Sequence, residues 1–355
     1  MEILITGGCG FIGSNFIRYI LKNYKEAKVI NIDKLTYAGN LANLSDLVKE
    51  YSPSRYQFIR GDIGDRKIVE GIFRETDIDW VVNFAAESHV DRSIEQPAEF
   101  LQTNILGTFA LLEAARKFWL DPASDLSKKR FLHISTDEVY GSLSDKGYFT
   151  ETTPYNPSSP YSASKAASDH LVYAYYRTYS LPTFITSSSN NYGPYQFPEK
   201  LVPLIINNAI RGKNLPVYGD GKNVRDWLYV EDHCSAIMAV LERGLAGQKY
   251  NIGAHCEKQN IDVVTTICDY LDKRLGLMDG RPRRELIEYV SDRLGHDRRY
   301  AIDASKIESE LHWQPSVAFN EGIVETIKWY LGNMAWVEDI ETGKYQEYYR
   351  KQINE

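Results

Sequence analysis

The sequence has few cysteines, no long apolar run and no concentration of positive charge. Its four cysteines show neither C-x-x-C pairs nor metal-ligand spacing, which argues against a disulfide framework and a bound metal. No stretch approaches the roughly 20 apolar residues that span a bilayer. The net charge is -7 without a basic tract, so nucleic acid is not an expected partner. His89 and His133 are interpreted as structural. The start of the chain lacks the features of a signal peptide, and we therefore expect a cytoplasmic protein with reduced thiols.

Apolar runs of strand length alternate with helical patterns in the first half of the chain. The expected strands are Glu2–Thr6, Lys28–Asp33, Tyr56–Arg60, Trp80–Phe84, Arg130–Ser135 and Thr183–Ser187, and the expected helices are Phe11–Asn23, Lys67–Glu75, Glu99–Phe118 and Ala163–Tyr179. Strands rich in Val, Ile and Leu that alternate with helices are typical of a parallel sheet covered on both faces. The sequence therefore predicts an α/β fold with a Rossmann-type, doubly wound parallel sheet.

The rhythm changes after residue 190. Turn-forming residues become dense, as in Asn191-Tyr192-Gly193-Pro194, and helical patterns follow at Leu201–Arg211, Asp262–Leu275 and Phe319–Leu331. We predict an NAD-binding domain over residues 1–190 and a smaller C-terminal substrate-binding lobe over 191–331, which can share strands with the first domain. The charged, tyrosine-rich tail 332–355 has no assigned role.

Glycines mark the turn between the first expected strand and the first expected helix. Gly7, Gly10 and Gly13 have the spacing G-x-x-G-x-x-G, and without side chains they let the backbone approach a pyrophosphate. The N-terminus of the following helix then offers unpaired N–H groups to the phosphates. Alone this pattern is weak, because glycines at such a turn can also serve packing.

Residues at the ends of the next strands strengthen the prediction of a dinucleotide site. Asp33 ends the second strand, where its carboxylate can bond a ribose diol and would repel a 2′-phosphate, which favours NAD over NADP. The alternative for Asp33 is a helix or turn cap. Asp62 follows the third strand and can meet the adenine amino group. Phe84-Ala85-Ala86 ends the fourth strand, and its small residues leave room for the cofactor.

Tyr161 and Lys165 form a Y-x-x-x-K pair one helical turn apart, so their side chains share a helix face. A nearby ammonium lowers the pKa of a phenol and favours the phenolate. We therefore expect Tyr161 to take an alcohol proton while hydride passes to a nicotinamide, and Lys165 to bond the nicotinamide ribose. The pair is common in helices by chance, and it gains weight here from the glycine motif upstream.

Thr136-Asp137-Glu138 follows the fifth expected strand, at the edge where open α/β sheets bind ligands. Two carboxyl groups held close together repel each other, so one tends to keep its proton. A neutral Asp137 can protonate a departing hydroxyl, and an ionised Glu138 can remove a proton from carbon. The alternative is that both acids cap the next helix or face water.

Such a pair of carboxyl groups suits one reaction of sugars. Oxidation of a C4 alcohol produces a ketone, which acidifies the C–H bond at C5. A base at C5 and an acid at the C6 hydroxyl together expel water, and the resulting enone accepts the hydride back at C6. The nicotinamide begins and ends the cycle oxidised, so it has to stay tightly held.

Several motifs together resemble the extended short-chain dehydrogenase/reductases, and more narrowly their nucleotide-sugar dehydratases. They are Gly7–Gly13, Asn83–Asp91, Thr136–Gly141, Tyr161–Lys165, Asn190–Lys200, Val224–Trp227 and Gly295–Tyr300, and the similarity runs from Met1 to about Leu331. The Thr-Asp-Glu triplet distinguishes the chain from related C4 epimerases, which usually carry a Ser-rich triplet there. The resemblance implies a hydro-lyase that holds NAD and converts dTDP-glucose to dTDP-4-keto-6-deoxyglucose and water.

The resemblance also implies roles for individual residues. It makes Tyr161 the C4 base, Asp137 the acid at C6 and Glu138 the base at C5, with Thr136 bonded to the C4 oxygen. Contacts to NAD fall on Phe11, Ile12, Asp33, Lys34, Thr36, Asp62, Ile63, Ala85, Ser88, Thr103 and Asn191. Contacts to the nucleotide sugar fall on Ser88, Asn190, Glu199, Lys200, Leu201, Arg225, Asn260 and His296, and Arg299 adds positive charge. The planar guanidinium of Arg225 also suits a diphosphate on physical grounds, with a surface ion pair as its alternative.

Two other functions stay open at this point. A nucleotide-sugar C4 epimerase would oxidise and re-reduce C4 without touching C5, and a non-catalytic NAD-binding sensor would be expected to lack part of the catalytic set. The sequence also leaves open the base of the nucleotide, hence another nucleotide hexose as substrate, and the pathway, rhamnose or another deoxysugar. By resemblance we expect a homodimer that pairs through Glu99–Phe118 and Ala163–Tyr179.

Overall fold

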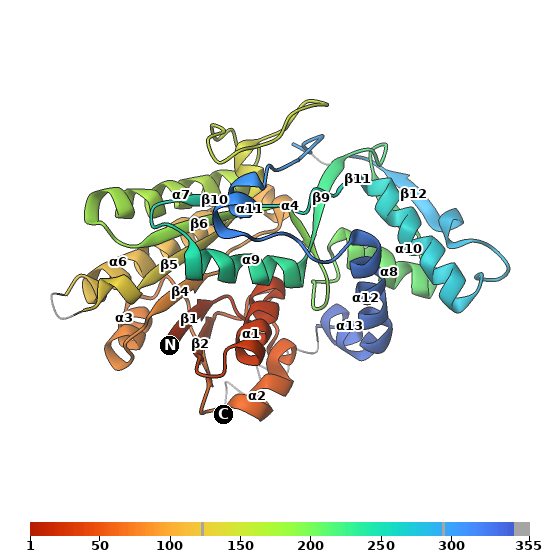
Figure 1. The fold of residues 1–355 in the computed structure, drawn as a ribbon. Coiled ribbons are helices and arrows are strands. Elements are labelled where there is room, and N and C mark those ends of the chain that lie inside the picture. Colours follow the sequence, from red (N-terminus) through yellow and green to blue (C-terminus); the bar gives the residue numbers. More distant parts are fainter. Residues whose placement is uncertain (122–123, 293–294, 344–355) are drawn as a thin grey trace.

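The computed structural model describes residues 1–121, 124–292 and 295–343, and a seven-stranded parallel sheet lies at the centre of this part (Figure 1). Its strands are β1 (Glu2–Thr6), β2 (Lys28–Asp33), β3 (Tyr56–Arg60), β4 (Trp80–Asn83), β5 (Arg130–Thr136), β6 (Thr183–Ser188) and β10 (Lys249–Ile252). They are ordered β10-β6-β5-β4-β1-β2-β3, so the chain winds outward in opposite directions from β1 and β4. The predicted doubly wound parallel sheet is confirmed.

Helices cover both faces of this sheet, which explains why its strands bury apolar side chains on both sides (Figure 1). One face packs against α1 (Phe11–Asn23), α2 (Ser45–Tyr51), α9 (Val230–Arg243) and α11 (Ser305–Leu311). The other packs against α3 (Arg66–Glu75), α6 (Thr108–Trp119) and α7 (Pro160–Tyr179). In β1, for example, Ile3 and Ile5 are buried on the first face and Leu4 on the second.

The long helix expected over Glu99–Phe118 is interrupted. It consists of α5 (Pro97–Phe100), a π-helical segment η2 (Leu101–Gly107) and then α6, and it is preceded by α4 (Val90–Glu95). Ser168 on α7 donates a hydrogen bond to the carbonyl of Asn104 at 2.7 Å. The side chain of Asn104 meanwhile bonds the backbone of Glu87 at 2.8 and 3.0 Å. These tertiary contacts use the backbone carbonyl and the side chain of Asn104 in the middle of the expected helix. They coincide with the wider π-helical turn at η2.

The second half of the chain contributes to the main sheet and also forms a smaller core of its own. Its edge strand β10 pairs with β6, and α9 packs against α1. A separate cluster joins α8 (Leu201–Arg211), α10 (Asn260–Leu275), α12 (Phe319–Gly332) and α13 (Met334–Glu341). Two small sheets lie beside these helices, one of β7 (Asn190–Tyr192), β9 (Val224–Tyr229) and β11 (Glu257–Gln259), the other of β8 (Leu215–Tyr218) and β12 (Ile287–Val290). The domain limits 1–190 and 191–331 stay predictions.

Short helical turns complete the described part: η1 (Leu41–Leu44), η3 (Leu126–Lys128), η4 (Asp137–Tyr140) and η5 (Arg283–Leu286). Of the tail 332–355, α13 is described, whereas residues 344–355 lie outside the described residues. Within the described ranges, no helix is both long and apolar enough to cross a lipid bilayer.

Candidate active site

A cavity of about 350 Å³ lies at the carboxyl ends of the central strands, where the strand order reverses between β1 and β4. Open α/β sheets bind their ligands at this position. The cavity brings together all the predicted cofactor residues: Gly7, Gly10, Phe11, Ile12, Gly13, Asp33, Lys34, Thr36, Asp62, Ile63, Phe84, Ala85, Ala86, Ser88, Thr103, Tyr161, Lys165 and Asn191. It is also lined by Thr136, Asp137, Glu138, Asn190 and Lys200.

The turn between β1 and α1 has the shape that a phosphate-binding loop needs. Gly7 has φ +66°, and a Cβ built there would lie 2.7 Å from the backbone nitrogen of Ala85. A Cβ on Gly13 would lie 2.4 Å from the Gly7 carbonyl oxygen. Because no side chain caps the start of α1 at Gly10, its first N–H groups are directed to the cavity. These features fit the pyrophosphate of a dinucleotide.

Asp33 makes the turn contacts of the alternative role, and its ribose-binding role stays a prediction. Its Oδ2 accepts a hydrogen bond from the Cys9 N–H at 2.9 Å, and its Oδ1 accepts one from the Leu35 N–H at 2.8 Å, so it braces two turns. It also lines the cavity at the end of β2, in the position for a ribose diol. Nearby, Lys34 pairs with Asp62 at 2.8 Å, which directs its charge toward that carboxylate.

The acidic pair lies where β5 turns into η4. Thr136 caps η4, since its Oγ1 accepts a hydrogen bond from the Glu138 N–H at 3.3 Å. Asp137 is only 2% exposed, and its Oδ2 has no hydrogen-bond partner in the described structure. Burial, and then the charge of Glu138, raise the pKa of Asp137 well above its usual range, while Arg225 opposes the shift. Burial and the neighbouring charge thus favour the neutral form of Asp137, which is the direction that the interpretation of the triplet requires.

Tyr161 stands in the first turn of α7, which begins earlier than expected. Ser159 and Ser162 form a capping box around Pro160, so the helix starts at Pro160 rather than at Ala163. Burial, and then the charge of Glu138, raise the pKa of Tyr161 well above its usual range. The lowered pKa expected for this phenol is not found in this structure, because burial and the charges of Glu138 and Asp137 act to raise it.

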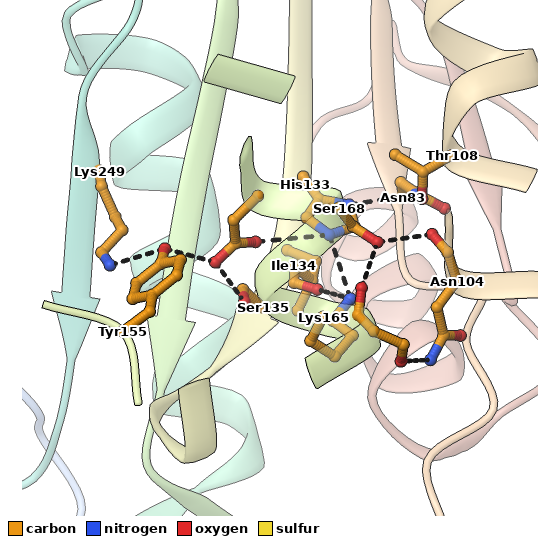
Figure 2. A network of polar contacts seen from close by, with 12 residues as sticks. Asn83, Asn104, Thr108, His133, Ile134, Ser135, Tyr155, Lys165, Ser168 and Lys249 are labelled. Carbon is orange, nitrogen blue, oxygen red and sulfur yellow. Dashed lines mark hydrogen bonds and ion pairs between the residues drawn. The ribbon is translucent and has the colours of Figure 1, made fainter. Parts of the chain in front are cut away.

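Lys165 is directed toward β5 (Figure 2). Its Nζ donates a hydrogen bond to the Ile134 carbonyl at 2.7 Å and lies 3.1 Å from Nε2 of His133. Burial lowers the pKa of Lys165 to about 8, and Asp169 acts in the opposite direction. Even so, Lys165 lines the cavity together with Tyr161.

Six residues predicted for the substrate do not line this cavity, namely Glu199, Leu201, Arg225, Asn260, His296 and Arg299. The guanidinium of Arg225 donates to the carbonyl oxygens of Val224 and Asp297, both at 2.8 Å, and so joins β9 to the loop before Tyr300. Arg299 pairs with Glu257 at 2.7 Å, which neutralises the charge expected there. Long-range pairing of this kind cannot be inferred from spacing in the sequence.

The other four of these residues lie nearby in the same lobe. Oε1 of Glu199 lies 3.5 Å from Nε2 of His89, and Nδ1 of His296 lies 2.5 Å from Oδ1 of Asp292. Leu201 begins α8, and the backbone N–H of Asn260 bonds the Asn223 carbonyl at 3.0 Å.

Two histidines have contacts to the site that the sequence interpretation missed. His133 lies against Lys165, as described above. His233 on α9 is fully buried, and its Nδ1 lies 2.9 Å from Oδ1 of Asn191, a cavity residue. Neither contact has a signal in the sequence, because the partners are 32 and 42 positions apart. Within the described ranges, no group of three or more His, Cys, Asp or Glu side chains could hold a metal ion.

Fold and cavity together define a class: a dinucleotide-dependent enzyme of the extended short-chain dehydrogenase/reductase type, with a Y-x-x-x-K pair and an acidic pair at one sheet edge. Residues 4–326 match the family model described as GDP-mannose 4,6 dehydratase. The chain therefore belongs to this family of NAD-dependent epimerases and dehydratases, and the resemblance inferred from the sequence is confirmed.

Relatives of known function lie close in sequence. The chain is 56% identical to the dTDP-glucose 4,6-dehydratase of Xanthomonas campestris pv. campestris, over 97% of each chain. It is 55% identical to dTDP-glucose 4,6-dehydratase 1 of Escherichia coli K12, over 98% of each.

Solved structures give the same picture. The Bacillus anthracis dTDP-glucose 4,6-dehydratase, in complex with NAD, is 47% identical with a TM-score of 0.85, over 96% of this chain and 99% of that one. A UDP-glucose 4-epimerase from Thermotoga maritima, solved with UDP-glucose, is 28% identical with a TM-score of 0.81, over 94% and 100%.

The buried His233 generates a prediction about stability. Burial lowers the pKa of His233 to about 3, whereas an unfolded histidine has a pKa of about 6.5. Between these values only the unfolded chain takes up the proton, so acid destabilises the fold. We expect the contribution of His233 to the free energy of unfolding to fall by roughly 2 kcal/mol from pH 7 to pH 5. His233→Gln should lack this loss, as measured by urea unfolding of both proteins at the two pH values.

The exposed His170 on α7 provides the control, since His170→Gln repeats the substitution away from the core. A difference between wild type and His233→Gln that stays the same at pH 7 and pH 5 would show that His233 is not held neutral.

Proposed function

We propose that this chain is an NAD-dependent dTDP-glucose 4,6-dehydratase, a hydro-lyase that forms dTDP-4-keto-6-deoxyglucose and water. The observation that carries the proposal is the buried Asp137 beside Glu138, in the same cavity as Tyr161 and the glycine turn. Oxidation and re-reduction at one carbon would need no such acid. The near full-length identity to dTDP-glucose 4,6-dehydratases supports the same reaction and favours thymidine as the base.

NAD is the proposed cofactor, because the uncapped start of α1 and the crowded glycines fit a pyrophosphate and Asp33 fits a ribose without a 2′-phosphate. When bound, NAD⁺ accepts a hydride, returns it later, and adds positive charge that favours the Tyr161 phenolate. The residues that would hold NAD are those of the glycine turn, those at the ends of β2 and β4, and Lys165.

The chain's own residues move the protons. Tyr161 accepts the proton of the C4 hydroxyl, and the hydroxyl of Thr136 bonds the C4 oxygen. Glu138 removes the C5 proton once C4 is a ketone, and Asp137 gives its proton to the C6 hydroxyl, which leaves as water. Glu138 then returns a proton to C5 as the hydride arrives at C6. One turnover places a proton on Tyr161 and takes one from Asp137, so one proton has to pass from Tyr161 back to Asp137, through water, before the next turnover.

A nucleotide-sugar C4 epimerase is the second candidate, since a UDP-glucose 4-epimerase shares the fold. The buried carboxyl group of Asp137 beside Glu138 argues against it. As further proposals, the protein is a homodimer and is cytoplasmic. Exposed apolar side chains on η2, α6 and α7 support pairing of two copies: Leu101, Leu106, Phe109, Tyr173 and Tyr179. The four cysteines are unpaired, which favours a reducing compartment.

Product analysis tests the proposed function. We expect incubation with dTDP-glucose in D₂O to yield a 4-keto sugar with a C6 methyl group and deuterium at C5, identified by NMR. UDP-, GDP- and CDP-glucose are tested in parallel. A preference for one of them would change the nucleotide base assigned to the substrate but not the reaction. A C4 epimer that retains its C6 hydroxyl would reject the dehydratase and establish the epimerase.

Removal of the acid should separate oxidation from dehydration. In Asp137→Asn the side chain keeps its shape but has no acidic proton to give to the leaving hydroxyl. We expect bound NADH to form after addition of dTDP-glucose, and water loss to slow by about 10²–10⁴-fold. Absorbance near 340 nm and quenched-flow product analysis measure the two steps. Water loss at the wild-type rate would show that another group is the acid.

Removal of the base should suppress chemistry at C5. Glu138→Gln keeps the size of the side chain, but its amide cannot take a proton from carbon. We expect no incorporation of solvent deuterium at C5 while slow C4 oxidation continues, as measured by mass spectrometry of recovered substrate and product. Asp137→Asn serves as the control and should still exchange. Exchange at the normal rate in Glu138→Gln would assign the base elsewhere.

A further inference from the structure

A third ionisable residue continues the face of α7 that carries Tyr161 and Lys165. Asp169 lies four positions after Lys165, so the pattern extends to Y-x-x-x-K-x-x-x-D, and residues at this spacing follow one side of a helix. Asp169 is 1% exposed and lies behind the cavity rather than in its lining. A carboxyl group buried this completely needs compensation by charge or hydrogen bonds.

Asp169 accepts two hydrogen bonds, both on the same carboxylate oxygen. Its Oδ2 accepts from Ser135 at the end of β5 at 2.8 Å and from the Tyr155 hydroxyl at 2.6 Å. Lys249 on β10 donates to the Tyr155 hydroxyl at 2.9 Å. The edge strand that the second half of the chain adds to the sheet thus brings a cation toward this carboxylate, and Lys249 also lies 4.2 Å from the ring centre of Tyr140.

The other oxygen of Asp169 faces Lys165 across a histidine. Its Oδ1 lies 3.6 Å from Nε2 of His133, and the same Nε2 lies 3.1 Å from Nζ of Lys165. His133 is fully buried, and burial together with Lys165 lowers its pKa well below the usual range, so the ring is neutral. The imidazole ring lies between the carboxylate of Asp169 and the ammonium of Lys165. The two groups therefore form no direct ion pair that would draw Lys165 away from the cavity.

A chain of hydrogen bonds decides where the proton of this neutral ring sits. The Ala85 N–H donates to Oγ1 of Thr6 at 3.1 Å, and Thr6 donates to Oδ1 of Asn83 at 2.6 Å. The amide nitrogen of Asn83 is therefore a donor, and it faces Thr108 and Nδ1 of His133, both at 3.1 Å. Nδ1 accepts, so Nε2 carries the proton, and this nitrogen lies 3.6 Å from Oδ1 of Asp169 and 3.1 Å from Nζ of Lys165.

Two protonation states of Lys165 are served by these neighbours. The ammonium form is stabilised by the Ile134 carbonyl and by the negative charge of Asp169, and a neutral amine would accept the proton of His133 Nε2. Asp169 is the nearby charge that favours the ammonium form of Lys165. The other ionisable groups around this pair are Tyr161 on α7, His133 on β5, Lys249 on β10, and Tyr140 and Tyr155.

We propose that Asp169 is a positioning residue, the counter-ion that acts across His133 to keep Lys165 protonated while leaving it in the lining of the cavity. The proposal deepens the proposed function, on which it rests only for the role of Lys165 during C4 oxidation. Loss of the Asp169 charge leaves the burial of Lys165 uncompensated, so the pKa of Lys165 should fall below about 8. The ammonium is then lost at a lower pH, and the alkaline limit of C4 oxidation moves down with it.

Asp169→Asn tests the proposal in the holoenzyme. The rate of bound-NADH formation after mixing with dTDP-glucose is measured from pH 6 to pH 10. We expect a small change at pH 6.5 and a downward shift of the alkaline limb by about one pH unit. Asp169→Glu, which keeps the charge, should retain the wild-type limb. In a Lys165→Arg background, Asp169→Asn should cause no shift, because a guanidinium stays charged over this range.

A second measurement does not depend on catalysis. Competitive labelling of the protein with acetic anhydride, read by mass spectrometry, gives the titration midpoint of Lys165 without substrate. This midpoint should also fall in Asp169→Asn. Asp303→Asn is the matched control, since Asp303 caps the turn before α11 through the Ser305 N–H, and it should move neither midpoint nor limb.

The outcomes separate the two proposals. A shifted Lys165 midpoint in a protein that forms no NADH with any nucleotide sugar supports the role of Asp169 and refutes the proposed function. An unshifted midpoint and limb in folded Asp169→Asn, or a rate reduced equally at every pH, overturns the role of Asp169. If Asp169→Asn does not fold, the labelling midpoint and pH limb of Asp169→Glu decide, and a midpoint moved down in that variant likewise overturns it.

Discussion

Removal of ionisable groups from water is the constraint on which the arrangement of the site depends. Asp137, Tyr161, Lys165, His133 and Asp169 are all buried at the carboxyl end of β5 or on the adjacent face of α7. Burial is the largest cause of the pKa shift in each of them, and it favours the neutral form in every case. The protein then adjusts individual groups with a few close charges: Glu138 raises the pKa of Asp137 further, whereas Asp169 opposes the lowering of the Lys165 pKa.

The parallel sheet makes this dry environment possible. Its strands are covered on both faces, and their carboxyl ends meet at the edge where β1 and β4 diverge. The glycine turn leaves backbone N–H groups at that edge, and β5 delivers the acidic pair a short distance away. Strand β10, contributed by the second half of the chain, extends the sheet beside β6 and supplies Lys249 to the polar network behind the cavity. Residues from both halves of the chain therefore belong to one polar network behind the cavity.

The sheet and the cavity could be predicted well from local patterns. Six of the seven strands of the main sheet in the described part were expected within one residue of their observed ends, because buried parallel strands are short continuous apolar runs. The exception is β10, whose Lys249-Tyr250-Asn251-Ile252 alternates in polarity. The interruption at η2 was also missed, because its Asn104 bonds Glu87 and Ser168, whose positions are 17 and 64 residues away in the sequence.

The sequence by itself determined the strand–helix alternation, the glycine turn and the residue types of the site, because each depends on spacing within one or two elements. Only the tertiary structure decided the electrostatics. Burial and the charge of Glu138 raise the pKa of Tyr161. The guanidinium groups of Arg225 and Arg299 are engaged by other segments of the chain, and His133 stands between Lys165 and Asp169. The pKa of a buried group depends on the water excluded around it and on charges brought from other strands, and neither quantity is encoded in local spacing.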